Sequence, residues 1–210
     1  TAGTSGQPKG AMLTHRALLS NLDQLLRVTD PPPMLPDDVV LIVLPMFHIY
    51  ALNAALGLVA RCGATAVISD RFDPEGSLRM VQDHKVTNIA GAPPMYIAWS
   101  AIPNFANRMS SVRMLASGAA PLLPAVYQQF ASAGLTIWEG YGMTEASPVI
   151  TSAIVTGVSN AGSVGHPLPG VETKLVDDSG NEVEEGDPGE IIVRGPNLFS
   201  GYWPDGADGP

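Results

Sequence analysis

The alternating pattern between residues 37 and 140 limits most strongly what this chain can fold into. Short β-branched apolar runs take turns there with longer segments of helical periodicity. Parallel strands need long crossover connections, usually helices, whereas antiparallel strands can be joined by short turns. The pattern therefore predicts an α/β fold built on a mostly parallel sheet with crossover helices.

The same runs give the bounds of the expected elements. A first helix is expected over residues 16–28, with Thr14 as its N-cap, and the prolines at 31–33 then break the chain. Strands are expected at 39–44, 64–69, 87–91, 112–116 and 135–138. Further helices are expected at 51–61, 75–84, 95–102 and 123–133.

Helical signals stop after about residue 150, and a second unit begins. Residues 172–176 and 190–194, with a turn at 177–181, are typical of a β-hairpin. We therefore expect an α/β subdomain over residues 1–155. A smaller, β-rich, barrel-like piece is expected over residues 156–210, and its Gly-, Pro- and Asp-rich tail suggests that it is truncated.

Charge and composition exclude several classes of protein. The net charge is -9, but residues 171–210 alone hold ten acidic and two basic residues, so we expect a solvated acidic surface there. No basic stripe exists to bind nucleic acid. The lone Cys62, expected in the core, excludes an internal disulfide. Neither an apolar run of roughly 20 residues nor a signal peptide is present, so the cytoplasm is the expected location.

The first ten residues, TAGTSGQPKG, combine glycines, hydroxyls and one lysine. Glycines let backbone N–H groups approach an anion, hydroxyls add donors, and Lys9 adds a positive charge, so the segment suits a phosphate cradle. It is not a Walker A loop, because Pro8 stands where the second glycine would be. Composition alone fits a flexible terminal loop equally well.

Polar or small residues follow four of the expected strands, at 45–48, 92–94, 117–121 and 139–145. In an open α/β sheet, ligands bind beyond the carboxyl ends of the strands, so these four segments should meet at one edge. We expect a ligand site there.

The residue types at that edge suit a nucleotide. Small residues at 118–120 leave room for a flat ligand, and Tyr141 offers an aromatic face for a purine. Thr144 and Glu145 could serve phosphate and metal, because Mg²⁺ takes oxygen ligands and keeps several waters. Each residue also has a plain structural interpretation, with Tyr141 in the core and Glu145 as a charge at a helix N-terminus.

Taken in order, these segments resemble the acyl-CoA synthetases of the adenylate-forming (AMP-binding) superfamily, which also contains luciferases and peptide-synthetase adenylation domains. The likeness covers nearly the whole chain, although Ala2 stands where the superfamily usually has a serine. The segments resemble, in turn, the phosphate loop (1–10), the acyl-pocket motif (45–48), two adenine-site motifs (117–121 and 139–145) and the β-barrel signature (162–167 and 189–202).

The resemblance implies a two-step reaction that uses ATP, Mg²⁺ and coenzyme A. A carboxylate attacks the α-phosphorus of ATP and releases pyrophosphate, and the thiol of coenzyme A then displaces AMP from the acyl adenylate. The implied acid is a fatty acid, and a lipid substrate would bring the protein to a membrane surface as a peripheral protein. The resemblance does not indicate an oligomeric state.

The resemblance also assigns roles to residues of this chain. The implied catalytic residues are Lys9, His48, Thr144 and Glu145. The implied ligands of Mg²⁺ are Thr4 and Glu145. The implied nucleotide-binding residues are Thr4, Ser5, Gly6, Lys9, Gly118, Ala119, Ala120, Glu139, Gly140, Tyr141, Gly142 and Thr144. The implied acyl-pocket residues are Phe47, His48, Tyr50, Gly91, Ala92 and Pro93.

Other functions stay open. Fatty-acyl-AMP ligases, which pass the adenylate to a carrier protein, commonly have an acidic residue where Ile49 stands, and this favours a CoA ligase. A non-catalytic module would bind ATP without cleaving it, and a kinase would release ADP instead of AMP. An apolar tunnel of Met46, Ile49, Leu52 and Met95 would suit an aliphatic acid. Because the superfamily's N-terminal portion and C-terminal lid are missing here, we expect the fragment alone to be inactive.

Overall fold

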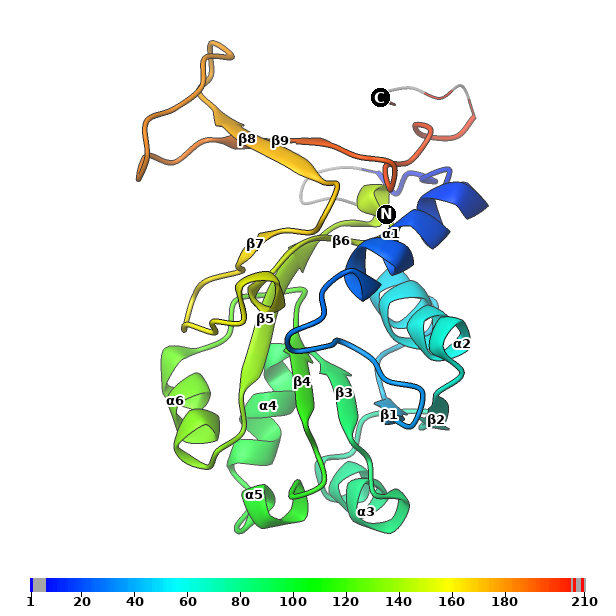
Figure 1. The fold of residues 1–210 in the computed structure, drawn as a ribbon, viewed down its shortest axis with the longest axis vertical. Helices are drawn as coiled ribbons and strands as arrows, with labels where there is room; N and C mark the ends of the chain where they lie inside the picture. Colours follow the sequence, from blue (N-terminus) through cyan, green and yellow to red (C-terminus); the bar gives the residue numbers. More distant parts are fainter. Residues whose placement is uncertain (2–6, 205, 207–208, 210) are drawn as a thin grey trace.

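A seven-stranded sheet in the order β2-β1-β3-β4-β5-β6-β7 forms the centre of the protein (Figure 1). The computed structural model describes residues 1, 7–204, 206 and 209. Strands β1 to β5 are parallel, and β6 and β7 add antiparallel strands at one edge, so the expected α/β class is confirmed. The strands are β1 Val39–Ile42, β2 Thr65–Ile68, β3 Asn88–Gly91, β4 Met114–Ser117, β5 Ile137–Gly142, β6 Val149–Ser152 and β7 His166–Pro167.

Helices cover both faces of this sheet. Alternate strand residues point to opposite faces, so Leu41 and Ile89 enter one core while Val40 and Ala90 enter the other. The first core is closed by α3 Pro74–His84, α4 Pro93–Ser100, α5 Phe105–Arg108 and α6 Pro124–Ser132. The second core is closed by α1 His15–Leu26, the π-helix η1 Tyr50–Gly57 and α2 Leu58–Cys62.

The expected helices and strands of the sheet region are present with shifted ends. Thr14 caps α1 as expected, because its Oγ1 accepts a hydrogen bond of 3.0 Å from the Ala17 N–H. The helix expected over 51–61 begins instead as a π-helix, and it ends where Gly63 takes a left-handed conformation. The half-buried Cys62 packs against the second core, and burial raises the pKa of its thiol. Helix α5 and strands β6 and β7 are additions to the expected set.

The expected hairpin forms a separate two-stranded sheet. Strands β8 Glu172–Val176 and β9 Glu190–Arg194 pair antiparallel, and Figure 1 shows them projecting away from the main sheet. Strand β7 pairs with β6, so the main sheet continues past residue 155 before the hairpin begins. The subdomain boundary at residue 155 stays a prediction. No described helix is long and apolar enough to cross a membrane.

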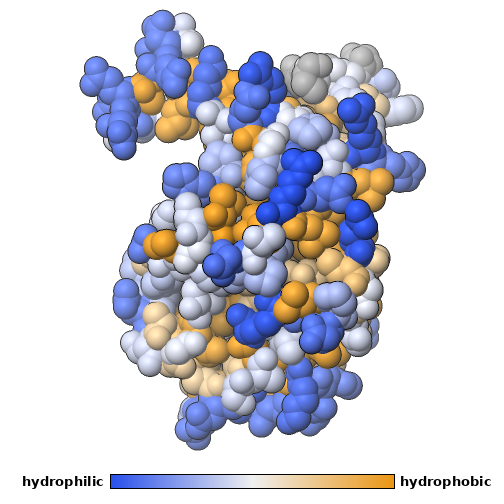
Figure 2. Space-filling model, in the orientation of Figure 1, coloured by the Kyte–Doolittle hydropathy of each residue, from blue (hydrophilic) through white to orange (hydrophobic). Residues whose placement is uncertain are grey.

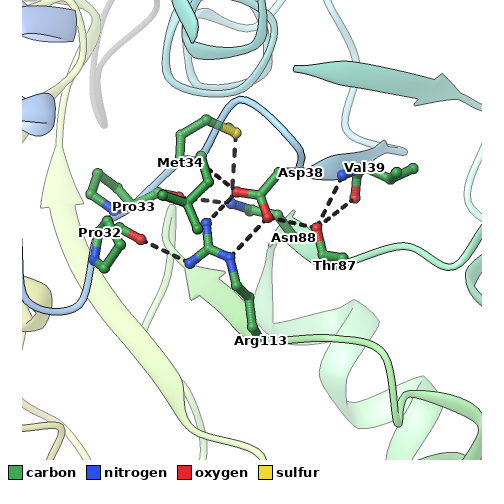
Figure 3. Close-up of polar contacts among 9 residues, drawn as sticks. Pro32, Pro33, Met34, Asp38, Val39, Thr87, Asn88 and Arg113 are labelled. Carbon is green, nitrogen blue, oxygen red and sulfur yellow. Dashed lines mark hydrogen bonds and ion pairs between the residues drawn. The ribbon is translucent and has the colours of Figure 1, made fainter. Parts of the chain in front are cut away.

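A buried carboxylate ties together the amino ends of three neighbouring strands (Figure 3). Asp38, with 2% of its surface exposed, directly precedes β1, and its Oδ1 accepts hydrogen bonds from Thr87 Oγ1 (2.7 Å) and Arg113 Nε (2.8 Å). Thr87 directly precedes β3, and Arg113 directly precedes β4. The Asp38 Oδ2 accepts from the Leu35 N–H and from the Arg113 guanidinium.

The same contacts set the ionisation of Asp38. Burial by itself raises the pKa of this carboxyl, but the hydrogen bonds from Arg113, Thr87 and Leu35 outweigh burial and leave the pKa below its ordinary value. The charged form is therefore the one that the fold stabilises. This contribution is present above the ordinary pKa of an aspartate and is lost as the pH falls through the lowered value.

The substitution Asp38→Asn should lower the free energy of unfolding by about 3 kcal/mol near neutral pH, because it leaves the half-buried Arg113 charge without its partner. Urea unfolding of the chain measures this. The matched control is Asp23→Asn, which breaks an ion pair with Arg61 whose side chains are 50% and 52% exposed, and should cost no more than about 0.5 kcal/mol. Equal losses in the two variants would contradict an anchoring role for Asp38.

Candidate nucleotide and acyl site

One cavity of about 860 Å³ runs along one face of the sheet, from Asn88 and Met114 at the amino ends of β3 and β4 to the carboxyl edge. Its walls contain residues that follow β1, β4 and β5, together with Lys9 from the glycine-rich start. The strand ends that the sequence analysis expected to converge do so. Figure 2 shows hydrophobic and hydrophilic residues side by side on the face of the molecule drawn there.

The cavity brings together ten of the predicted site residues. These are Lys9, His48, Tyr50, Gly118, Ala119, Gly140, Tyr141, Gly142, Thr144 and Glu145. Three others, Thr4, Ser5 and Gly6, lie outside the residues that the structure describes. The remaining six, Phe47, Gly91, Ala92, Pro93, Ala120 and Glu139, do not line it.

The predicted acyl-pocket residues do not all lie together, and the acyl pocket stays a prediction. Phe47 is 92% exposed, and Met46 and Leu52 also face solvent. Gly91 faces the opposite side of the sheet, where an added Cβ would lie 3.0 Å from the Tyr96 hydroxyl, and Met95 packs in that same first core. Proximity in sequence to a strand end did not decide which face each residue takes.

The apolar floor of the cavity is the sheet itself. Ala90, Ala116 and Trp138 are register partners across β3, β4 and β5, and all three line the cavity. Leu25 and Ile49 contribute from the helical side. These floor residues were not among the predicted site residues, although the period of two along each strand could have identified Ala116 and Trp138, which lie two residues before Gly118 and Gly140.

His48 has a defined tautomer. Its Nδ1 accepts a hydrogen bond of 3.2 Å from the Tyr50 backbone N–H, so the neutral ring carries its proton on Nε2. His48 lines the cavity and can therefore donate from Nε2 to an anion. Tyr50 fixes this corner further, because its hydroxyl donates to the Ala116 carbonyl at 3.3 Å and burial raises its pKa, which keeps the phenol protonated.

The Glu139 carboxylate is buried and binds two segments of backbone. It is 4% exposed, and its Oε2 and Oε1 accept hydrogen bonds from the backbone N–H groups of Leu122 and Gly162, both at 3.2 Å. The first bond fastens the loop of residues 118–122 to β5, and the second fastens the segment at Gly162. The adjacent Ala119 has φ of +72°, a left-handed conformation that a residue with a Cβ seldom adopts. Both carboxylate oxygens of Glu139 thus bind backbone N–H groups, and its predicted contact with the nucleotide stays a prediction.

Gly142 is required by a close approach of two backbone segments. A Cβ at this position would lie 2.2 Å from the Pro148 carbonyl oxygen. The backbone at residue 142 therefore lies close to the backbone at residue 148. The side chains of Asn21 in α1 and of Asn197 bind this segment. Asn21 exchanges two hydrogen bonds with the Val149 backbone (2.8 and 3.1 Å), and Asn197 donates to the Ala146 carbonyl at 2.8 Å.

The glycine-rich start is fastened to the opposite end of the chain. Residues 10–12 pair with residues 200–203 through three backbone hydrogen bonds of 2.8 to 3.0 Å. The Lys9 Nζ lies 4.6 Å from the centre of the Tyr202 ring, and the Tyr202 hydroxyl donates to Glu145 Oε1 at 2.6 Å. Lys9, Tyr202 and Glu145 all line the cavity. In the sequence, Tyr202 belongs only to the segment that resembles the β-barrel signature.

A divalent cation fits this set of donors. The described residues contain no group of three or more His, Cys, Asp or Glu side chains suited to a metal. Mg²⁺ needs no such group, because it commonly takes one or two carboxylates and completes its shell with water and substrate phosphates. Glu145 is the carboxylate that the cavity offers for this purpose.

A parallel sheet whose carboxyl edge brings a lysine and a carboxylate to one cavity is typical of a nucleotide-binding α/β protein. The chain belongs to the AMP-binding enzyme family, since that family's model matches residues 1–203. The resemblance found in the sequence is thereby confirmed for the family.

Two relatives and one solved structure illustrate the match. Feruloyl-CoA synthase of Amycolatopsis sp is 38% identical over 97% of this chain and 41% of its own length. Long-chain-fatty-acid–CoA ligase of Yersinia pestis is 36% identical over 99% of this chain and 38% of its own length. ATP-bound MatB from Rhodopseudomonas palustris has a TM-score of 0.91 at 33% identity, over 100% of this chain and 41% of that one. This chain spans about two fifths of the length of these relatives.

The substitution Glu139→Gln should lower the free energy of unfolding by about 2 kcal/mol and weaken ATP binding, because an amide accepts at only one of its two ends and the 118–122 loop loses a backbone contact. Urea unfolding and ATP titration measure the two effects. The control is Glu184→Gln on the exposed hairpin segment, which should change stability by less than about 0.5 kcal/mol. A Glu139→Gln variant as stable as this control would argue against the supporting role.

Proposed function

We propose that this chain is the ATP- and acid-binding portion of a longer acyl-CoA synthetase. The observation that carries the proposal is the single cavity in which a charged rim adjoins an apolar floor, so that a nucleotide and the carboxyl end of an apolar acid would meet beside His48. Membership of the AMP-binding enzyme family supports it, as do relatives named CoA synthase and CoA ligase.

In this proposal the protein contributes mainly position and charge. Lys9 neutralises the terminal phosphates of ATP, and Thr144 donates its hydroxyl to the α-phosphate. Glu145 holds Mg²⁺, which would offset the charge that develops as pyrophosphate leaves. His48 donates from Nε2 to the substrate carboxylate and orients it toward the α-phosphorus. Coenzyme A thiol would then displace AMP from the acyl adenylate.

The proposed acid has a bulky apolar portion. Ala90, Ala116 and Trp138 offer a flat apolar floor, and burial of each CH₂ group on it is worth about 0.8 kcal/mol. Relatives are named for ferulate, which is aromatic, and for long-chain fatty acids. Both shapes suit such a floor, so we infer a hydrophobic aliphatic or aromatic acid as the substrate class.

Carboxylate-dependent exchange of pyrophosphate into ATP by the full-length ligase, with coenzyme A omitted, tests the proposal. Straight-chain acids from short to long and aromatic acids are compared. Exchange with a hydrophobic class establishes adenylation and identifies that class. Nucleotide binding without exchange for any acid would favour a non-catalytic module, and exchange without later transfer to coenzyme A would favour a carrier-protein acceptor.

Replacing Lys9 with alanine in the full-length ligase should weaken ATP binding by roughly tenfold or more, because a charge-assisted contact to phosphate is worth about 1.5–3 kcal/mol. Isothermal titration with ATP and the rate of exchange measure the change. Lys174→Ala, which removes an exposed lysine from β8, is the matched control and should leave both unaltered. An ATP affinity equal to that of the control would remove Lys9 from the phosphate site.

Enlarging Ala116 to leucine should obstruct the apolar floor. The KM for a long or aromatic acid should rise roughly tenfold, since overfilling a packed site costs about 1–3 kcal/mol, while the KM for ATP stays unchanged. Steady-state kinetics across an acid series measure this. Ala131→Leu on the exposed side of α6 serves as the control. Equal KM values for short and bulky acids in the Ala116 variant would place the acid elsewhere.

A further inference from the structure

We propose that Tyr202 is a positioning residue of this site, which orients the Glu145 carboxylate through its hydroxyl and supports the Lys9 ammonium through its ring. The inference rests on the proposed function, because Glu145 and Lys9 are there the groups that meet Mg²⁺ and phosphate. It adds to that function a residue that acts on both charged groups from outside the reacting atoms.

The hydroxyl contact restricts Glu145 strongly. The Tyr202 O–H donates to Glu145 Oε1 at 2.6 Å, and the Phe199 backbone N–H donates to the Glu145 carbonyl at 2.8 Å. Residues 199–202 thus hold both the backbone and the side chain of Glu145. With Oε1 bound to the phenol, Oε2 is the oxygen left to coordinate a cation. A partner of this kind around a metal-binding carboxylate typically changes metal affinity by about 10–100-fold.

The ring contact acts on the opposite charge. The Lys9 Nζ lies 4.6 Å from the ring centre, within the range of a cation–π interaction. The ring itself is fixed, because Phe199 packs edge-on against it at 5.0 Å and Ala11 bridges to Tyr202 through the backbone. One half-buried side chain therefore contacts the cationic and the anionic member of the site at the same time.

Two substitutions separate these roles. Tyr202→Phe removes the hydroxyl and keeps the ring over Lys9, whereas Tyr202→Leu removes both contacts. The control is Tyr127→Phe, which removes a hydroxyl with the same 2.6 Å bond, to the Ser159 carbonyl; neither residue lines the cavity. Urea unfolding compares the structural cost of losing each hydroxyl.

The metal readout uses Mn²⁺ in place of Mg²⁺. Electron paramagnetic resonance titration of the full-length ligase with Mn²⁺ and ATP should show a roughly tenfold weaker ternary complex for Tyr202→Phe, in the same direction as Glu145→Gln. The Mg²⁺ concentration for half-maximal pyrophosphate exchange should rise by a similar factor, with the KM for the acid unchanged. ATP affinity without metal should fall only in Tyr202→Leu.

The outcomes distinguish the two proposals. Mn²⁺ affinity and Mg²⁺ dependence in Tyr202→Phe equal to those of Tyr127→Phe would overturn the positioning role. Weaker Mn²⁺–ATP binding in Tyr202→Phe, in a protein that shows no exchange with any acid, would support the positioning role while the proposed adenylation fails. A lower affinity for ATP in the absence of metal in Tyr202→Phe would contradict the proposal that the hydroxyl acts on Glu145 and the ring acts on Lys9.

Discussion

The Asp38 carboxylate holds the amino ends of β1, β3 and β4 together, and the geometry of the site depends on that contact. Asp38 thereby joins the amino ends of three parallel strands, and two of these strands place the register partners Ala90 and Ala116 in the wall of the cavity. Pro33, Met34 and Asn88, which lie beside the Asp38 contacts, line the same cavity (Figure 3). The ion pair therefore supports one wall of the cavity as well as the strand ends.

The sequence specified the fold well because periodicity reports local geometry. Alternation of short and long apolar segments marked the strands and their crossover helices, and Thr14 marked the start of α1. Short strands with weak patterns were not predicted. Strand β7 has two residues, and its pairing with β6 depends on a contact between segments that no local pattern records. The π-helical start of η1 was not predicted either, because its apolar residues fit a regular helix equally well.

The site was specified less completely. Motifs identified the segments that meet, but the face that each side chain takes depends on tertiary packing. Gly91 faces the Tyr96 ring and Phe47 faces solvent, although Gly91 ends β3 and Phe47 follows β1, and both strands lead to the cavity. Glu139 belongs to an adenine-site motif in sequence, yet in space it binds two backbone N–H groups. Tyr202 reaches the site through pairing with residues almost two hundred positions earlier, which no spacing rule can anticipate.

The pairing of residues 10–12 with residues 200–203 also has a consequence for biosynthesis. Lys9 leaves the ribosome near the beginning of translation of these 210 residues, whereas Tyr202 leaves near the end. The last strand of the central sheet ends at residue 167, so all of its strands are synthesised before residues 200–203. Lys9 and Tyr202 can therefore meet only after the whole sheet has been translated, and this contact is among the last that the growing chain can make.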